Sequence, residues 1–195
     1  MAERRSATPV PGARRDARRN RDLLLASARH MYDERGTDVS LEEVARHAGL
    51  GVATIYRHFP SQEALLEAML SDRFIALGSR ARELAGQEDS DAALVDWLHA
   101  YITHSTRYRG LALSIMSGLR DQDSPLAASC SAMQDGGAEL LARAQLDGRI
   151  RADLDMADLL RLVTAVAVTA GPQPREAARL LDLLLDGLRP RDPAA

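Results

Sequence analysis

Apolar residues recur along this chain every three or four positions, which is the spacing of one face of an α-helix. Between residues 24 and 32 they fall at i, i+4, i+7 and i+8. Similar spacing returns in residues 41–48, 61–85, 94–108, 126–144, 153–170 and 175–188. No stretch alternates apolar and polar residues with the period of two that a half-buried strand shows. The pattern therefore predicts an all-α protein.

The predicted helices near the N-terminus are bounded by signals for a short turn. Ser40 stands three residues before Glu43, which is the spacing of a capping box at the start of a helix. Gly49 closes that helix, and Gly51 can cap a further helix that Pro60 ends. Two short helices joined by a glycine turn form a helix-turn-helix.

Charge is distributed unevenly along the chain. The formal net charge is −3, yet residues 1–60 hold 11 arginines and 8 acidic residues, whereas residues 61–195 hold 14 and 20. Seven of the arginines lie in residues 1–21, beside two acidic residues. We expect residues 1–19, which have little to bury, to be a disordered basic arm. Such an arm suits phosphates or the minor groove of DNA, although an arginine-rich tail can also be merely solvated.

Residues 51–58 have the parts of a recognition helix, which brings side chains to base edges while neighbouring groups hold phosphates. The small residues at its start allow close approach and contact with thymine methyl groups, and the donors that follow can reach phosphates or a guanine edge. Taken singly, its tyrosine and histidine could be ordinary surface residues. Together with the inward-facing Ile55 and Phe59 they predict a DNA contact. The expected DNA-binding residues are Ser40, Gly51, Val52, Ala53, Thr54, Tyr56, Arg57, His58, Arg18 and Arg19.

The last two predicted helices are apolar on more than one face. Leucines at 180, 181, 184 and 188 form one stripe, while Leu183 and Leu185 leave the opposite side apolar too. One internal core does not need so much apolar surface, so we expect a homodimer with a four-helix interface. The expected interface residues are Val163, Ala167, Ala170, Ala177, Leu180, Leu181, Leu184 and Leu188.

Four short runs occur in a fixed order near the predicted turn: SLEEVA at 40–45, AG at 48–49, TIYRHFPS at 54–61 and EALL at 63–66. With them, the region from residue 20 to about residue 69 resembles the DNA-binding domain of the TetR family of transcriptional repressors. The resemblance implies an all-α chain of about nine helices, with a DNA-binding domain over residues 20–60 and a ligand-binding and dimerisation domain over residues 61–195.

Two positions depart from the pattern of that family. Gly51 stands where serine or threonine often caps the recognition helix, and Gln62 stands where a basic residue is usual. The amide of Gln62 can donate a hydrogen bond to phosphate but brings no charge. One phosphate contact of the family is therefore in question.

The resemblance also implies a pocket for a small-molecule effector in the C-terminal domain. Trp97, Tyr101, His104 and Tyr108 are spaced by four, three and four and share one face of a predicted helix that should be buried. His104 is either a core histidine with satisfied hydrogen bonds or a polar group in the pocket. The expected ligand-binding residues are Trp97, Tyr101, His104, Ser105, Tyr108, Met116, Cys130, Met133 and Gln134. This lining favours a hydrophobic or aromatic effector.

Other classes of protein are disfavoured. The chain has no glycine-rich phosphate loop, no His-Glu-x-x-His and no Gly-x-Ser-x-Gly, so we expect no enzyme, no cofactor and no metal. The single Cys130 excludes an intramolecular disulfide framework and fits a reducing cytoplasm. The most apolar run, residues 162–170, is too short to cross a bilayer, so we expect a cytoplasmic protein without a membrane partner.

These features together predict a ligand-responsive transcriptional regulator, most simply a repressor. It would bind a near-palindromic double-stranded DNA operator as a homodimer and leave it when a small effector binds. The alternative is a constitutive, architectural DNA-binding protein. That alternative gives no reason for the acidic helical region of residues 61–195.

Overall fold

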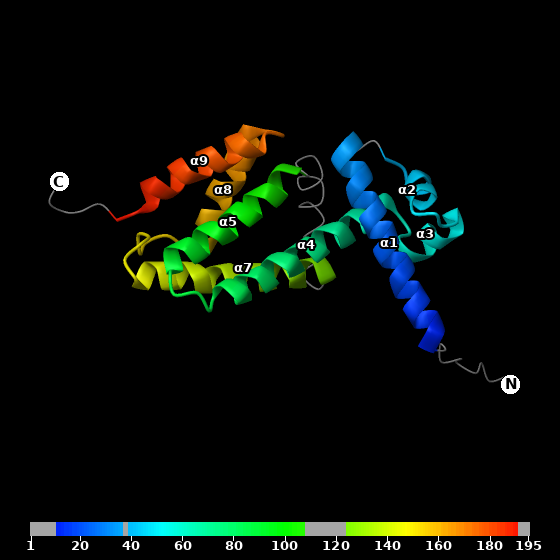
Figure 1. The fold of residues 1–195 in the computed structure, drawn as a ribbon, viewed down its shortest axis with the longest axis horizontal. Helices are drawn as coiled ribbons and strands as arrows, with labels where there is room; N and C mark the ends of the chain where they lie inside the picture. The colour runs from blue at the N-terminus through cyan, green and yellow to red at the C-terminus, as the bar shows by residue number, and fades with distance from the viewer. Residues whose placement is uncertain (1–10, 37–38, 108–123, 191–195) are drawn as a thin grey trace. The chain divides into compact units, whose positions relative to one another are not determined.

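The computed structural model describes residues 11–36, 39–107 and 124–190, and all regular structure in these ranges is α-helical (Figure 1). Eight helices lie within them, labelled α1 to α5 and α7 to α9. The prediction of an all-α protein is confirmed. The chain divides into two compact units, residues 1–66 and residues 67–195, and each buries apolar side chains of its own.

The first unit is built on α1 (Pro11–Arg35), α2 (Leu41–His47) and α3 (Val52–His58), each of which contacts the other two. Its core forms because the predicted apolar stripes of these three helices face one another. The side chains buried there are Leu24, Leu25, Ala28, Met31, Tyr32, Val39, Leu41, Val44, Ala45, Ile55, Phe59, Leu65 and Leu66.

The predicted turn signals act as expected. The Ser40 hydroxyl accepts the backbone N–H of Glu43 at 3.2 Å, and the Glu43 carboxylate accepts the backbone N–H of Ser40 at 2.9 Å, which completes the capping box. Gly49 has φ +68°, a left-handed conformation that favours glycine, and it ends α2. Gly51 is the N-cap of α3, with an extended backbone. The sequence prediction of a helix-turn-helix is confirmed.

The prediction of a disordered arm is wrong for residues 11–19, because α1 begins at Pro11. Proline is favoured in the first turn of a helix, where its missing N–H has no partner to lose. Alanine and arginine, which make up most of the segment from residue 13 to residue 19, are among the best helix formers. The first helix therefore continues outward beyond the core. Residues 1–10 of the predicted arm lie outside the described residues.

The second unit contains most of α4 (Gln62–Leu84), with α5 (Ser90–Arg107), α7 (Pro125–Leu146), α8 (Met156–Ala170) and α9 (Pro174–Leu188). Helix α5 contacts α7, α8 and α9, and α8 also contacts α7 and α9. Among the described residues, no helix is both long enough and apolar enough to span a bilayer.

The boundary between the units falls after Leu66, inside α4, whereas we expected the first domain to end at residue 60. The first turn of α4 belongs to the first unit because its side chains are fixed there. Leu65 is fully buried, and the Gln62 amide nitrogen donates to the Tyr32 hydroxyl at 2.9 Å and to the carbonyl oxygen of Val39 at 3.3 Å.

The largest buried side chain of the second unit is Trp97 of α5, which has no exposed surface. Its indole N–H donates to the carbonyl oxygen of Leu77 on α4 at 3.0 Å, so its one polar group is satisfied. Gly137 of α7 lies against the ring, and a Cβ atom there would come within 2.5 Å of the Trp97 Cη2 atom. A Cβ on Gly136 would lie 2.8 Å from the Cβ of Ala81 on α4. This glycine pair allows α7 to approach α4 and α5 closely.

Candidate functional site

The outer face of α3 gathers most of the side chains that were predicted to bind DNA. Ile55 has no exposed surface and Phe59 is buried, so these two residues fix the inner face of α3 in the core. Val52 and Tyr56 are 45% and 44% exposed, although both are large and partly apolar. Thr54 and His58 are half-buried at the edges of this face. The residues exposed on α3 and its N-cap are Gly51, Val52, Ala53, Tyr56 and Arg57.

Tyr56 is joined to α2 by a residue that the sequence did not single out. Its hydroxyl donates a hydrogen bond to the Glu42 carboxylate. That bond lowers the pKa of the Glu42 carboxyl, and acceptance by Glu42 raises the pKa of the Tyr56 phenol. A carboxylate therefore stands beside the predicted phosphate-binding tyrosine. Glu42 follows directly after the first residue of α2, and only the three-dimensional contact between α2 and α3 brings it to Tyr56.

Arg57 lies along its own helix. Its Nε donates to the carbonyl oxygen of Ala53 and its Nη2 to the hydroxyl of Thr54, both at 3.2 Å. All three groups are at the surface, so the guanidinium can leave these acceptors for a stronger, charged one. Ser40 is exposed, but its hydroxyl serves as the cap of α2.

Gln62 stands where the TetR family usually has a basic residue, and its side-chain amide is able to donate to phosphate. The amide instead donates to Tyr32 and Val39 inside the first unit. Burial raises the pKa of the Tyr32 phenol above its usual value, and the Tyr32 hydroxyl donates in turn to the Val39 carbonyl oxygen at 3.5 Å. The residue that departs from the usual basic one therefore has a structural role in fixing α4 to α1.

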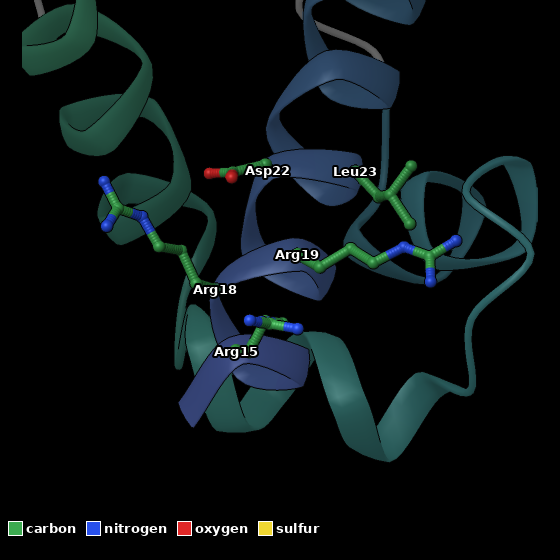
Figure 2. A pocket seen from close by; sticks show the side chains of 5 residues that line it. All are labelled: Arg15, Arg18, Arg19, Asp22 and Leu23. Carbon is green, nitrogen blue, oxygen red and sulfur yellow. The ribbon is translucent and has the colours of Figure 1, made fainter. Parts of the chain in front are cut away.

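Arg18 and Arg19 lie on the exposed part of α1, before its first core residue, Leu24. An open hollow of about 410 Å³ lies along this part of α1. Figure 2 shows Arg18 and Asp22 projecting from one side of the helix and Arg19 and Leu23 from the other. The residues that line the hollow are Arg15, Arg18, Arg19, Asp22 and Leu23.

The predicted effector residues fall into two groups in the second unit. Trp97 and Met133 belong to its core, where Met133 is only 2% exposed and Trp97 is closed in by Gly137. Both side chains are enclosed by packed neighbours, and a pocket lined by Trp97 and Met133 stays a prediction. The indole ring does stack on the ring of Tyr101, with centroids 6.0 Å apart and planes at 23°.

The second group of predicted effector residues consists of Tyr101, Ser105, Cys130 and Gln134, and Tyr101 is at its centre. Its hydroxyl lies 3.1 Å from the hydroxyl of Thr164 on α8, a partner that the sequence pattern did not indicate. Burial raises the pKa of the Tyr101 phenol and of the half-buried Cys130 thiol. The Ser105 hydroxyl donates back to the Tyr101 carbonyl oxygen, and the exposed Gln134 amide donates to the Cys130 sulfur at 3.6 Å.

The remaining predicted effector residues lie where the structure gives no side-chain description: the His104 side chain, Tyr108 and Met116 are outside the described residues. Within the part of the chain that is described, no three His, Cys, Asp or Glu side chains gather to hold a metal ion.

Most residues of the predicted dimer interface are committed to the core of the same chain. Six of the eight are buried against α5 and neighbouring helices and present almost no surface to a second copy: Val163, Ala167, Ala170, Ala177, Leu181 and Leu188. That part of the prediction is wrong, because helical spacing identifies an apolar stripe but not the body that covers it. Leu180 and Leu184 are half-buried, and both helices carry other apolar side chains outside the core. Among those, Leu162, Val168 and Leu183 are exposed.

The first unit thus presents a helix-turn-helix with an exposed, donor-bearing outer face, and the second unit is a larger helical bundle. These are the parts of a DNA-binding transcriptional regulator. Residues 24–69 match the family described as bacterial regulatory proteins of the tetR family, and residues 89–190 match the C-terminal domain described as transcriptional regulator SbtR-like. The chain belongs to the TetR family of transcriptional regulators, which is not a family of enzymes.

Similar proteins support this membership over most of the chain. An uncharacterized HTH-type transcriptional regulator of Mycobacterium bovis is 30% identical over 169 residues, which is 84% of each chain. A TetR transcriptional regulator from Streptomyces coelicolor is similar in structure, with a TM-score of 0.68, 34% identity and coverage of 88% of this chain and 99% of that one. A TetR regulatory protein from Mycobacterium vanbaalenii gives a TM-score of 0.65, 31% identity and coverage of 91% and 99%.

Proposed function

We propose that this TetR-family regulator is a ligand-responsive repressor. It binds a near-palindromic operator as a homodimer, and a small hydrophobic or aromatic effector releases it. The observation that carries the proposal is the outer face of α3, where the exposed Val52 and Ala53 stand beside the hydrogen-bond donors Tyr56 and Arg57. An exposed valine on a helix of seven residues is unfavourable in water and useful against a thymine methyl group.

The two-fold symmetry of the proposal rests on the apolar side chains of α8 and α9 that are exposed or only half-buried. We name these residues the outer α8–α9 face: Leu162, Ala165, Val168, Leu180, Leu183 and Leu184. Leu183 is 57% exposed, the most of any large apolar side chain on the two helices. Burial of this face against a second copy forms a four-helix interface. The dimer then carries two helix-turn-helix domains, one for each half-site of the operator.

The proposed effector region is the group around Tyr101. Its hydroxyl pair with Thr164 links α5 to α8, and Cys130 of α7, a soft and largely apolar side chain, is close enough to Tyr101 to affect the pKa of its phenol. A half-buried hydroxyl pair beside apolar side chains suits an effector with an aromatic or aliphatic body and one hydrogen-bonding group. Because α8 also carries the outer α8–α9 face, an effector that separates Tyr101 from Thr164 would change the dimer.

The proposed function is tested by selection of bound duplexes from a random DNA pool, repeated with candidate hydrophobic and aromatic compounds present. We expect recovery of a near-palindromic sequence and loss of its binding with at least one compound class. A recovered palindrome that no compound affects would indicate constitutive DNA binding. Failure to recover any preferred sequence would contradict sequence-specific regulation.

The residues of α3 are expected to divide into base-reading and phosphate-binding groups. Changing Val52 to serine should alter the preferred sequence at one position of each half-site, because it removes a methyl contact. Changing Tyr56 to phenylalanine should weaken binding to all sequences alike by about two- to tenfold, since it removes one hydrogen bond to phosphate. Both are measured by selection and by fluorescence anisotropy. A change in sequence preference for the Tyr56 variant would show that the two roles are assigned wrongly.

Glu42 is expected to oppose DNA binding, because the Glu42 carboxylate already accepts the hydrogen bond that the Tyr56 hydroxyl would otherwise donate to a phosphate. Changing Glu42 to glutamine removes a negative charge from the DNA-facing surface and replaces the charge-assisted hydrogen bond from Tyr56 by a weaker one, which a phosphate can displace more easily. We expect operator affinity to rise by about two- to tenfold at low salt and the gain to shrink as salt screens the charge. The control is Glu139→Gln, an exposed carboxylate of α7. Weaker binding by the Glu42 variant would mean that the carboxylate serves to orient Tyr56.

A further inference from the structure

The N-terminal part of α1 forms a band of positive charge on a continuous helix. Arg14, Arg15, Arg18 and Arg19 are all exposed, and no ion pair or hydrogen bond holds their guanidinium groups within the described part of the chain. Many other exposed arginines of the protein are engaged, such as Arg161 with Asp158 at 2.6 Å. The positive charges of this band are therefore available to bind an anionic partner molecule.

The body of the first unit ends where this band begins. The Arg21 guanidinium lies over the ring of Phe59, 5.7 Å from its centroid, and Leu24 is the first residue of α1 that is fully buried. Residues 11–19 extend beyond that point by about 14 Å at the rise of an α-helix. Most side chains of residues 11–19 do not pack in the core of the first unit. Burial of apolar atoms therefore does not explain why the helix continues over these residues.

The hollow along this helix does not suit a small molecule. Its five lining residues all come from α1, so one helix forms its only wall. A small-molecule site normally encloses most of its ligand between several elements. Three of the five lining residues are arginines, whose planar guanidinium groups pair well with phosphate (Figure 2). An extended polyanion that runs along the helix fits this surface better.

We propose that residues 11–19, as an extension of α1, bind the phosphate backbone of DNA outside the bases that α3 reads. This rests on the proposed function. The helical form decides which part of the duplex is contacted, because an α-helix with its side chains is about 10–12 Å wide and the minor groove is about 6 Å wide. An unfolded arginine tail could enter the minor groove, whereas this helix cannot. The extension therefore adds affinity without adding sequence preference.

The test is the salt dependence of DNA binding by a triple variant, Arg15→Gln, Arg18→Gln and Arg19→Gln. Each lost phosphate contact lowers the slope of log K against log salt by about 0.9, so we expect a decrease of about 3 for each protomer bound. The sequence recovered by selection should stay the same. The matched control changes three exposed arginines of the second unit to glutamine, Arg82, Arg149 and Arg175, and should leave the slope unchanged.

A further variant, Ala17→Pro, keeps every arginine and interrupts the helix. We expect it to lose salt-dependent affinity as the triple variant does, because the guanidinium groups no longer lie along one axis. Wild-type slope in the triple variant, or an altered preference at the operator flanks, would overturn the proposal; so would wild-type affinity in Ala17→Pro. Failure of the proposed function itself is distinguishable, since the wild-type protein would then select no preferred DNA.

Discussion

Changing Leu183 to glutamate should convert the protein to a monomer and weaken operator binding by at least about a hundredfold. Leu183 is 57% exposed on α9, so the substitution leaves the core of the chain intact. In a two-fold interface the same substitution occurs on both sides, and burial of two unpaired carboxylates costs several kcal/mol. Each 1.4 kcal/mol corresponds to a factor of ten in affinity. A monomer retains contact with one half-site, so weak binding to a single half-site should remain.

The measurement combines molar mass from light scattering with anisotropy titrations of full and half-site duplexes. Leu146→Glu is the matched control, since Leu146 is 86% exposed at the end of α7 and lies outside the outer α8–α9 face. The control should remain dimeric and bind the operator normally. A dimeric Leu183 variant with wild-type operator affinity would place the interface elsewhere on the protein.

The helices and their caps could be predicted because their determinants are local. The Ser40–Glu43 capping box and the left-handed Gly49 depend on residues a few positions apart, and both occur as expected. The outer face of α3 could be predicted for a similar reason, because Ile55 and Phe59 fix which side of a short helix is buried.

Contacts between helices could not be read from spacing. Glu42 reaches Tyr56, and Thr164 reaches Tyr101, through pairings that join residues 14 and 63 positions apart. The prediction of the dimer-interface residues was wrong for a related reason. Apolar periodicity on α8 and α9 identified the stripe that packs in the chain's own core, and only the burial of Val163 and Leu181 shows which side remains open.

The extension of α1 shows a different limit. Low apolar content correctly indicated that residues 11–19 have little to bury, but helix formation there needs no core of its own. The turns from Leu24 onward are held by the first unit, and each further residue of good helical propensity then adds to an existing helix without the cost of a new nucleus. Composition therefore predicted the exposure of the segment and missed its conformation.

Changing Gly137 to alanine should destabilise the protein, and the result separates two roles for Trp97. The new Cβ atom would lie within 2.5 Å of the indole ring, which has no exposed surface and is held by its hydrogen bond to Leu77. Overpacking of this kind costs about 1–3 kcal/mol, which exceeds the gain of up to about 1 kcal/mol from replacing glycine in a helix.

The matched control is Gly78→Ala on α4, where a Cβ atom meets its nearest neighbour, the Ala132 carbonyl oxygen, at an ordinary 3.5 Å. That variant should be as stable as the wild type or slightly more stable, because alanine favours the helix. Both are measured by urea unfolding followed through tryptophan fluorescence, and Trp97 is the only tryptophan of the chain. If Trp97 lined an effector cavity, its ring could move into that space, and the Gly137 and Gly78 variants would be equally stable. A loss of stability confined to the Gly137 variant would instead assign Trp97 to the packed core and leave effector recognition to the side chains around Tyr101.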